Sequence, residues 1–213
     1  ANGTFHDVRD DSILISFRTQ DCIAKIDRRT GALKWILGDH GRWQGEWTDK
    51  LLKPEGQLMW NYHQHDPSLT PAGSVMCFDN GNHRALPFDP PLPHEENFSR
   101  AVEFAVDEQR RTVRQVWSYG EGPGERLFAG FQGGAVRLQS TGNTFVTYGG
   151  ICSIGGKPAD EPDGADTRAR LIEVTPEKRV VLDIEIGGAP GDSKLLSSFR
   201  ATHVPQEMDL DWQ

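Results

Sequence analysis

The sequence predicts an all-β fold made of repeated four-stranded antiparallel units. No long window carries a 3.6-residue apolar period, so signals for helix are nearly absent. Short β-rich runs recur instead, and turns are frequent because the 213 residues include 23 glycines and 13 prolines. A strand followed by a hairpin occurs three times, giving a repeat of roughly 65–80 residues. The three units are expected at residues 1–38, 56–120 and 134–186.

The first unit contains a strand and a hairpin. Residues 12–17 are rich in β-forming side chains, and residues 22–27 alternate between apolar and polar. The chain then turns at a glycine and returns through residues 32–37. No further strand is recognised ahead of residue 12, so the first strand of this unit is expected to precede Ala1.

The second unit repeats this design with an additional strand at its start. Strands are expected at residues 56–62 and 75–78, before a hairpin of residues 101–106 and 112–117. The hairpin turn lies at residues 107–110 and is polar, as hairpin turns usually are.

The third unit has the same order. Strands at residues 135–139 and 144–148 precede a hairpin of residues 171–174 and 180–184. An extra C-terminal strand is expected at about residues 198–205, which in a closed ring of sheets would complete a unit begun elsewhere.

Three insertions separate the predicted strands, at residues 39–55, 85–98 and 149–168. They explain why the repeat exceeds the roughly 40–50 residues of common propeller repeats. The alternative architecture is a self-contained β-sandwich, which also consists of short antiparallel strands.

Composition excludes several classes of function. The net charge of −8, with no basic run, argues against a nucleic-acid partner. No apolar stretch approaches the length of a membrane-spanning helix. The spacing of Cys22, Cys77 and Cys152 fits no metal motif, and the first two lie in apolar strands, so they are interpreted as small buried hydrophobic residues.

The segment from Asn61 to Arg84 contains the densest group of chemically active side chains. It holds three of the seven histidines, His63, His65 and His83, together with Arg84. A polar Asp-Asn-Gly turn follows an apolar strand here and directs polar side chains to one end of a sheet. Imidazoles and a guanidinium gathered at such an end suit a small oxyanion such as sulfate or phosphate.

Five short motifs, taken in order, resemble the bacterial arylsulfate sulfotransferase family. They are Trp35–Gly38, Gln64–His65, Phe78–Gly81 with Arg84, Ser99–Val102 and Val116–Gly120. The resemblance implies a six-bladed β-propeller, of which this chain holds about three blades from the C-terminal half. It also implies sulfuryl transfer from an aryl sulfate to a phenol without a nucleotide donor or other cofactor, in a periplasmic or exported protein.

The resemblance also assigns candidate site residues. His65 aligns with an active-site histidine and would assist transfer of the proton or charge, and Arg84 aligns with the arginine that would hold the sulfate. His63, Asn80 and Gln132 are the expected substrate-binding residues. The alternatives are a structural histidine at a turn and a surface arginine paired with a carboxylate.

The nucleophile of the family has no counterpart here. Family enzymes carry the sulfuryl group on a histidine after the Trp-x-Tyr-Gly segment, but residues 121–138 contain none, and Gln132 lies near the expected place. Glutamine cannot form a comparable covalent intermediate. Another family histidine would fall just before Ala1. A noncatalytic propeller that binds an anionic or aromatic ligand or a protein partner therefore remains the alternative function.

Three further features have two interpretations each. The pair His63 and His65 could bind a metal, but without a clear third ligand no metal site is predicted. The acidic loop 160–166 could bind calcium, although a solvated insertion is favoured. Trp43 and Trp47 could line a pocket for an aromatic acceptor or pack the first insertion onto its sheet.

The partners that the resemblance implies are an aryl sulfate and a phenol. Formation of a homo-oligomer is left open.

Overall fold

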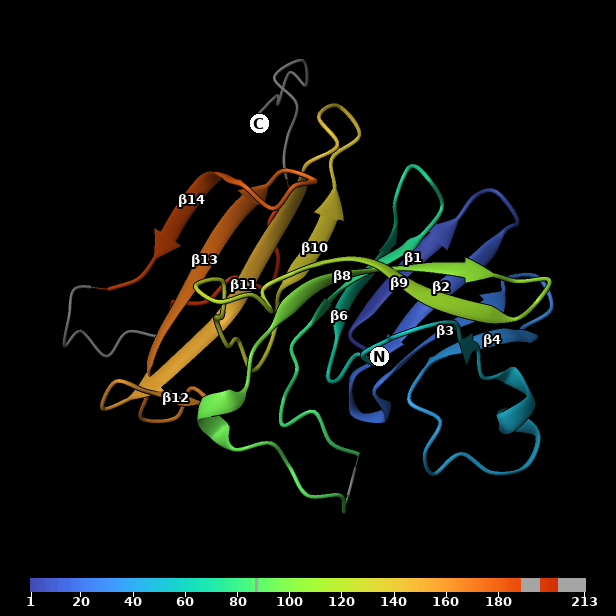
Figure 1. Ribbon diagram of the computed structural model, residues 1–213, viewed down its shortest axis with the longest axis horizontal. Helices are drawn as coiled ribbons and strands as arrows, with labels where there is room; N and C mark the ends of the chain where they lie inside the picture. The colour runs from blue at the N-terminus through green and yellow to red at the C-terminus, as the bar shows by residue number, and fades with distance from the viewer. Residues whose placement is uncertain (87, 189–195, 203–213) are drawn as a thin grey trace.

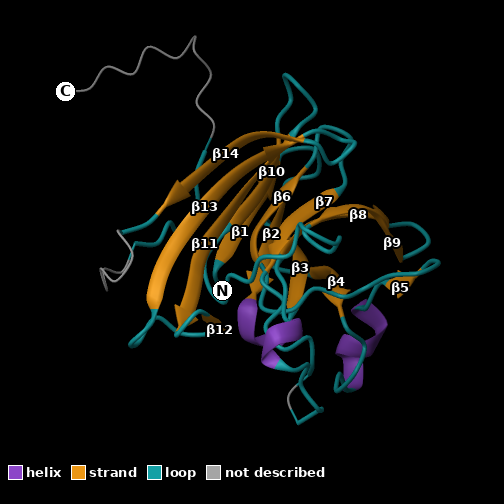
Figure 2. Ribbon diagram, turned by 60° about the vertical axis from the view of Figure 1, so that its left-hand side comes forward, coloured by secondary structure: helices purple, strands orange, loops and turns teal. Residues whose placement is uncertain are grey.

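The computed structural model describes residues 1–86, 88–188 and 196–202 and contains three β-sheets (Figure 1). The all-β prediction is confirmed, since strands account for 46% of the structure and helices for 6%. Figure 2 shows short helical segments at one end of the sheets. In the described ranges these are three 3₁₀ helices, η1 (Arg18–Gln20), η2 (Gly45–Lys50) and η3 (His94–Glu96).

The first sheet has four antiparallel strands in chain order. They are β1 (Gly3–Asp7), β2 (Ser12–Phe17), β3 (Cys22–Asp27) and β4 (Leu33–Gly38). The prediction that the first strand precedes Ala1 is wrong, because β1 pairs with β2 along its whole length. Its sequence gives little signal, since Phe5 is the one large apolar residue that it contributes.

The second sheet also has four antiparallel strands, joined by a two-residue strand that runs parallel to β9. The strands are β6 (His65–Leu69), β7 (Val75–Asp79), β8 (Arg100–Asp107), β9 (Thr112–Tyr119) and β5 (Lys53–Pro54). The prediction of a strand at residues 56–62 is wrong, because the first of the four antiparallel strands is β6. It contains Pro67, which is tolerated because β6 lies at an edge and its pairing with β7 shifts between His65 and Ser68.

The third sheet contains the longest strands. They are β10 (Gly134–Arg137), β11 (Thr144–Ile154), β12 (Lys157–Ala159), β13 (Asp166–Val174) and β14 (Val180–Ile186). Much of the insertion expected at 149–168 is therefore a strand extension. Residues 198–202 form no strand, and 203–205 lie outside the described residues, although the Ser198 amide donates to the Gly149 carbonyl and the Gly133 amide to the Phe199 carbonyl.

The second sheet is buried between the other two. Successive side chains on a strand face opposite ways. Accordingly, Val75 and Cys77 of β7 join a core shared with the first sheet, whereas Met76 and Phe78 join a core shared with the third. The first strands of the three sheets are also neighbours, since β6 contacts both β1 and β10. The structure therefore has three stacked sheets, whereas the alternative architecture, a self-contained β-sandwich, has two.

The cysteine prediction is confirmed. All three cysteines are buried and free of disulfide bonds. Among the described residues, no helix is both long and apolar enough to cross a membrane.

The outer strand of the third sheet, β14, is exposed on both faces. Five apolar side chains, Val180, Val181, Leu182, Ile184 and Ile186, are between 37% and 54% exposed. β14 pairs with β13 on one side, and in the described part of the chain no strand pairs with its other edge. A β-sheet edge with this composition is a surface that other β-strands can join.

Candidate functional site

The predicted site residues gather at one end of the three sheets. Because the strands are antiparallel, the starts of β1 and β6 meet the ends of β2 and β7 there, and the start of β10 pairs with Thr147 in the first half of β11. Several non-glycine residues at this end have positive φ angles: Asp21, His63, Asp66, His83, Arg84 and Gln132. Such strained backbone costs on the order of 1–3 kcal/mol per residue and clusters at functional sites. The backbone thus marks this end as the candidate site.

His65, at the start of β6, is held as a neutral imidazole with a defined tautomer. Its ring is buried, and its Nδ1 lies 2.7 Å from Oδ1 of Asn80. A carboxamide oxygen can only accept, so Nδ1 donates and Nε2 keeps its lone pair. Burial lowers the pKa of His65, which favours the uncharged ring. Within the part of the chain that the structure describes, Nε2 makes no hydrogen bond, so it can accept a proton or act as a nucleophile.

Asn80 has its orientation fixed by two backbone carbonyls. Its Nδ2 donates to the carbonyl of Ala129 at 2.7 Å and to that of Gln132 at 2.8 Å, so its Oδ1 must face His65. The buried Asn80 side chain thereby joins β6, the end of β7 and the loop before β10. The structure brings His65, Asn80 and Gln132 together, and Asn80 contacts protein groups through both ends of its amide.

Gln132 lies in this loop with a φ of 57°. Its Oε1 is buried and has no hydrogen-bond partner among the described residues. An unpaired buried acceptor costs roughly 1–3 kcal/mol, and such atoms at a site commonly meet a ligand or water. Gln132 is therefore a suitable substrate contact, as its predicted role requires.

Arg84 follows the same turn but serves a different group. Its Nη1 donates to Oδ2 of Asp79 at 2.9 Å, its Nη2 donates to the carbonyl of Phe98 at 2.8 Å, and its guanidinium stacks 3.9 Å from the Phe98 ring. The same Asp79 oxygen also accepts from Nε of Arg100 at 2.7 Å. Burial alone would raise the pKa of Asp79, but the two guanidinium charges outweigh this effect and lower it. The side chain of Arg84 is thus directed at Asp79 and Phe98. Asn80, the residue after Asp79, faces His65 instead.

His63 and His65 contact different partners. The His63 amide donates to Oδ1 of Asp21 at 2.6 Å, and the Nδ1 of its ring lies 3.1 Å from the same oxygen. His65 is bound to Asn80 instead. The two imidazoles therefore do not converge as a metal-binding pair.

Two residues near His65 were not predicted. The positive charge of Arg18 contributes to the lowered pKa of His65, and its Nη2 donates to the carbonyl of Gly130 at 3.1 Å. Phe199 packs edge-on against His65, with ring centroids 6.3 Å apart. Arg18 directly follows β2, and its position at a strand end could have indicated it. Nothing in the pattern around Phe199 indicates this contact.

The other sequence features lie elsewhere. Trp43 and Trp47 line a largely apolar cavity of about 500 Å³ against one face of the first sheet, and none of the candidate site residues lines it. In the acidic loop, Glu161, Asp163 and Asp166 are exposed, which agrees with a solvated insertion. Asp160, in contrast, turns toward His83 and His94.

Known proteins resemble this chain over most of its length. The profile of the arylsulfotransferase (ASST) family matches residues 1–193. Arylsulfate sulfotransferase AssT of Escherichia coli O6:H1 strain CFT073 is 34% identical over 228 aligned positions, covering 97% of this chain and 36% of that protein. The AssT protein of Lelliottia amnigena is 32% identical, covering 72% of this chain and 28% of its own length. The chain spans about a third of these relatives, and it belongs to the arylsulfotransferase family.

Proposed function

We propose that this protein transfers a sulfuryl group from an aryl sulfate to a phenolic acceptor without a nucleotide donor. The observation that supports this most directly is His65 of the Gln-His motif, a buried imidazole of lowered pKa whose Nε2 makes no hydrogen bond to the described residues. Membership of the arylsulfotransferase family supports the same chemistry. The chain spans 36% of its Escherichia coli relative.

The proposal includes a fold. We interpret the three sheets as consecutive blades of a β-propeller, with β1, β6 and β10 as the inner strands nearest its axis. Two observations support this: these first strands are neighbours, and each pair of consecutive sheets shares a core. The blades of a propeller surround a central channel, and His65 lies at the start of one of these inner strands.

In the proposed reaction the acceptor phenol donates its proton to Nε2 of His65. The phenolic oxygen forms a bond to sulfur as the bond from sulfur to the donor's aryl oxygen breaks. The leaving phenolate takes up a proton from solvent, and His65 releases its own proton to solvent. The transition state places negative charge on the peripheral sulfate oxygens, so fixed cationic donors stabilise it. The family resemblance implies Arg84 as this donor, although its Nη1 and Nη2 already donate to Asp79 and Phe98, and Arg18 is a second candidate because its charge acts on His65.

Turnover of a chromogenic aryl sulfate with phenol present tests the proposal. Removing a preorganised donor typically costs about 100-fold or more in kcat. His65→Ala and Arg18→Gln should each lose activity by at least this factor, and His6→Ala, on the exposed part of β1, should retain it. If His65→Ala keeps normal turnover, His65 has no part in the chemistry.

The alternative is a noncatalytic propeller that binds an anionic or aromatic ligand or a protein. The absence of a histidine from residues 121–138 favours it. Turnover, combined with peptide mapping after incubation with a labelled aryl sulfate, separates the two functions. Turnover without label agrees with direct transfer, label on His65 would replace it with a two-step reaction in which His65 carries the sulfuryl group, and no label and no turnover would favour binding alone. A periplasmic or exported location belongs to the same proposal, and cell fractionation tests it.

A further inference from the structure

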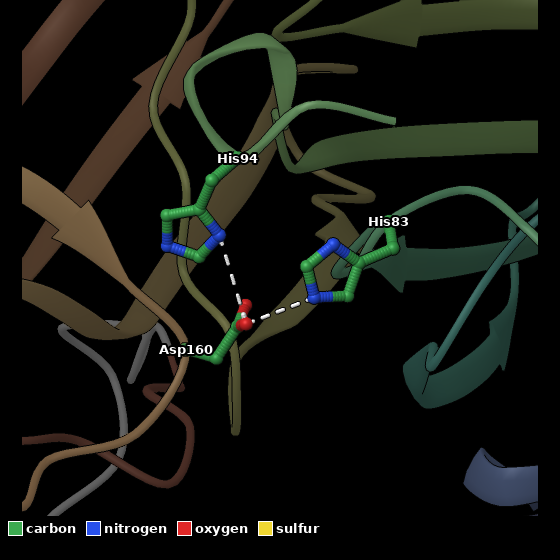
Figure 3. A group of neighbouring side chains, drawn as sticks. All are labelled: His83, His94 and Asp160. Atoms are coloured by element: carbon green, nitrogen blue, oxygen red, sulfur yellow. Dashed lines mark hydrogen bonds and ion pairs between the residues drawn. The ribbon is translucent and has the colours of Figure 1, made fainter. Parts of the chain in front are cut away.

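Two imidazoles and one carboxylate converge beside the candidate site, and the proposed sulfuryl transfer does not use them (Figure 3). His83 follows β7, His94 begins η3, and Asp160 follows β12. Nε2 of His83 lies 2.9 Å from Oδ2 of Asp160, and Nδ1 of His94 lies 3.7 Å from the same oxygen. We propose that these three side chains bind a divalent transition-metal ion of the zinc class.

The distances suit such an ion. The candidate donor atoms of the three side chains all lie within 4.8 Å of one another. A tetrahedral zinc ion with bonds of about 2.0–2.1 Å places its donor atoms roughly 3.3 Å apart, and the observed 2.9 and 3.7 Å bracket this value. Two imidazoles and a carboxylate are ligands that zinc accepts, and a water molecule would complete the fourth position.

An unpaired oxygen also points to a ligand here. Oδ1 of Asp160 is buried and has no hydrogen-bond partner among the described residues. Leaving a buried carboxylate oxygen unpaired is unfavourable, and a bound cation or its coordinated water would compensate it. The three side chains are each about one-third exposed, so an ion can reach them from solvent.

Neighbouring groups hold the two rings in position. The amide of His83 donates to Oδ1 of Asn97 at 3.0 Å, which leaves Nδ2 of Asn97 3.4 Å from Nδ1 of the His83 ring. The ring of His94 packs edge-on against Phe128 at 5.9 Å. These contacts fix the positions of the two rings, but second-shell partners in known metal sites accept a hydrogen bond from the ligand histidine, whereas Nδ2 of Asn97 is a donor.

The metal would link two loop regions next to the loop that contains Ala129 and Gly130. His83 lies just before the second insertion, His94 lies within it, and Asp160 belongs to the third. A Cβ atom at Gly130 would lie 2.6 Å from the Asp160 carbonyl oxygen, so the two backbones touch. The residue before Gly130, Ala129, accepts a hydrogen bond from Asn80. The ion would thus support the loop that positions His65 through Asn80, without touching the substrate.

Titration of the chelator-treated protein with Zn²⁺ or Co²⁺ tests the proposal. We expect one tight site, and the Co²⁺ form should show the visible absorption of a four-coordinate ion. Asp160→Asn and His94→Ala should weaken binding by at least about 10-fold. His6→Ala is the matched control, because it removes an imidazole that lies 2.9 Å from Asp11 at the surface. Absence of stoichiometric binding, or equal binding by all four proteins, would overturn the proposal.

A loss of metal binding could also result from misfolding, so a substitution that should raise the affinity for metal is tested as well. Metal at Nε2 of His83 requires the ring proton on Nδ1, where the wild-type protein presents the Nδ2 donor of Asn97. Asn97→Asp replaces this donor with an acceptor and retains the oxygen that binds the His83 amide. We expect about 10-fold tighter Zn²⁺ binding at pH 8. Unchanged or weaker binding by this variant would contradict ligation through Nε2 of His83.

Discussion

Asp79→Asn should destabilise the protein strongly, because it removes the carboxylate shared by two buried guanidiniums. Arg100 would keep Glu121 at 2.6 Å, but Arg84 would lose the one carboxylate that it contacts within the described residues. Breaking a buried ion pair costs about 3–5 kcal/mol, and the remaining partner of Arg100 favours the lower value, about 3 kcal/mol. This is a large share of a typical domain stability of about 5–15 kcal/mol.

Urea unfolding followed by tryptophan fluorescence measures this loss. With a slope of about 2 kcal/mol/M, a loss of 3 kcal/mol lowers the midpoint by about 1.5 M. Arg84→Met should cost less, because Asp79 keeps Arg100, and Asp163→Asn, on the exposed acidic loop, should leave the midpoint unchanged. A loss below about 1 kcal/mol for Asp79→Asn would refute the assignment of Asp79 as the partner on which Arg84 depends.

The pH dependence of the free energy of unfolding gives an independent check of the pairing of Asp79 with Arg84 and Arg100. The pKa of Asp79 is lowered in the folded protein, so its ionised form stabilises the fold above the unfolded pKa of about 3.9. This contribution is lost as the pH falls from about 3.9 through the folded value. The difference in stability between wild type and Asp79→Asn should therefore stay constant from pH 7 to about pH 4.5 and narrow at lower pH.

Three further predictions concern single groups. Because the pKa of His65 is lowered, kcat/KM should decline on the acid side only below about pH 6.5, and a midpoint above that value would contradict a neutral buried base. The three buried thiols should resist Ellman's reagent in the native protein and react fully in denaturant; burial raises the pKa of Cys22 to about 12, so its fast reaction in the folded state would be unexpected. Gly133→Ala should cost about 2 kcal/mol or more in urea unfolding, because the residue has a φ of 107° and its Cβ would lie 2.6 Å from an aromatic ring. Gly142→Ala, with a φ of 74° and open space around it, should cost clearly less.

The hairpins were predictable because their signals are local. Each combines alternating apolar residues with a polar turn, as at β3–β4, β8–β9 and β13–β14. The missed strands, β1 and β6, lack this pattern for physical reasons. β1 has one large apolar side chain, and β6 contains a proline and a register shift that break its alternation. Tertiary pairing with β2 and β7 forms them despite weak local preference.

The candidate site was predictable only in part. His65 is identified by its motif, but its partner Asn80 lies 15 residues away and is brought to it by strand pairing. The pairing of Arg84 with Asp79 depends on how the turn after β7 folds back, which spacing alone does not specify. The contact between His83, in the turn after β7, and Asp160, in the third insertion, joins residues 77 positions apart, so no spacing rule could have indicated it.

The exposed apolar strand β14 has a consequence for handling the protein in solution. A two-sided edge of valine, leucine and isoleucine invites identical strands from other molecules to add in register. The flanking charges Asp183 and Glu185 alternate with the apolar residues and repel their copies in a neighbouring molecule near neutral pH. Acidification or high salt would weaken this repulsion, so turbidity should rise under those conditions at high protein concentration. Dilute, low-salt buffers near neutral pH are therefore the conditions in which this chain should remain monodisperse.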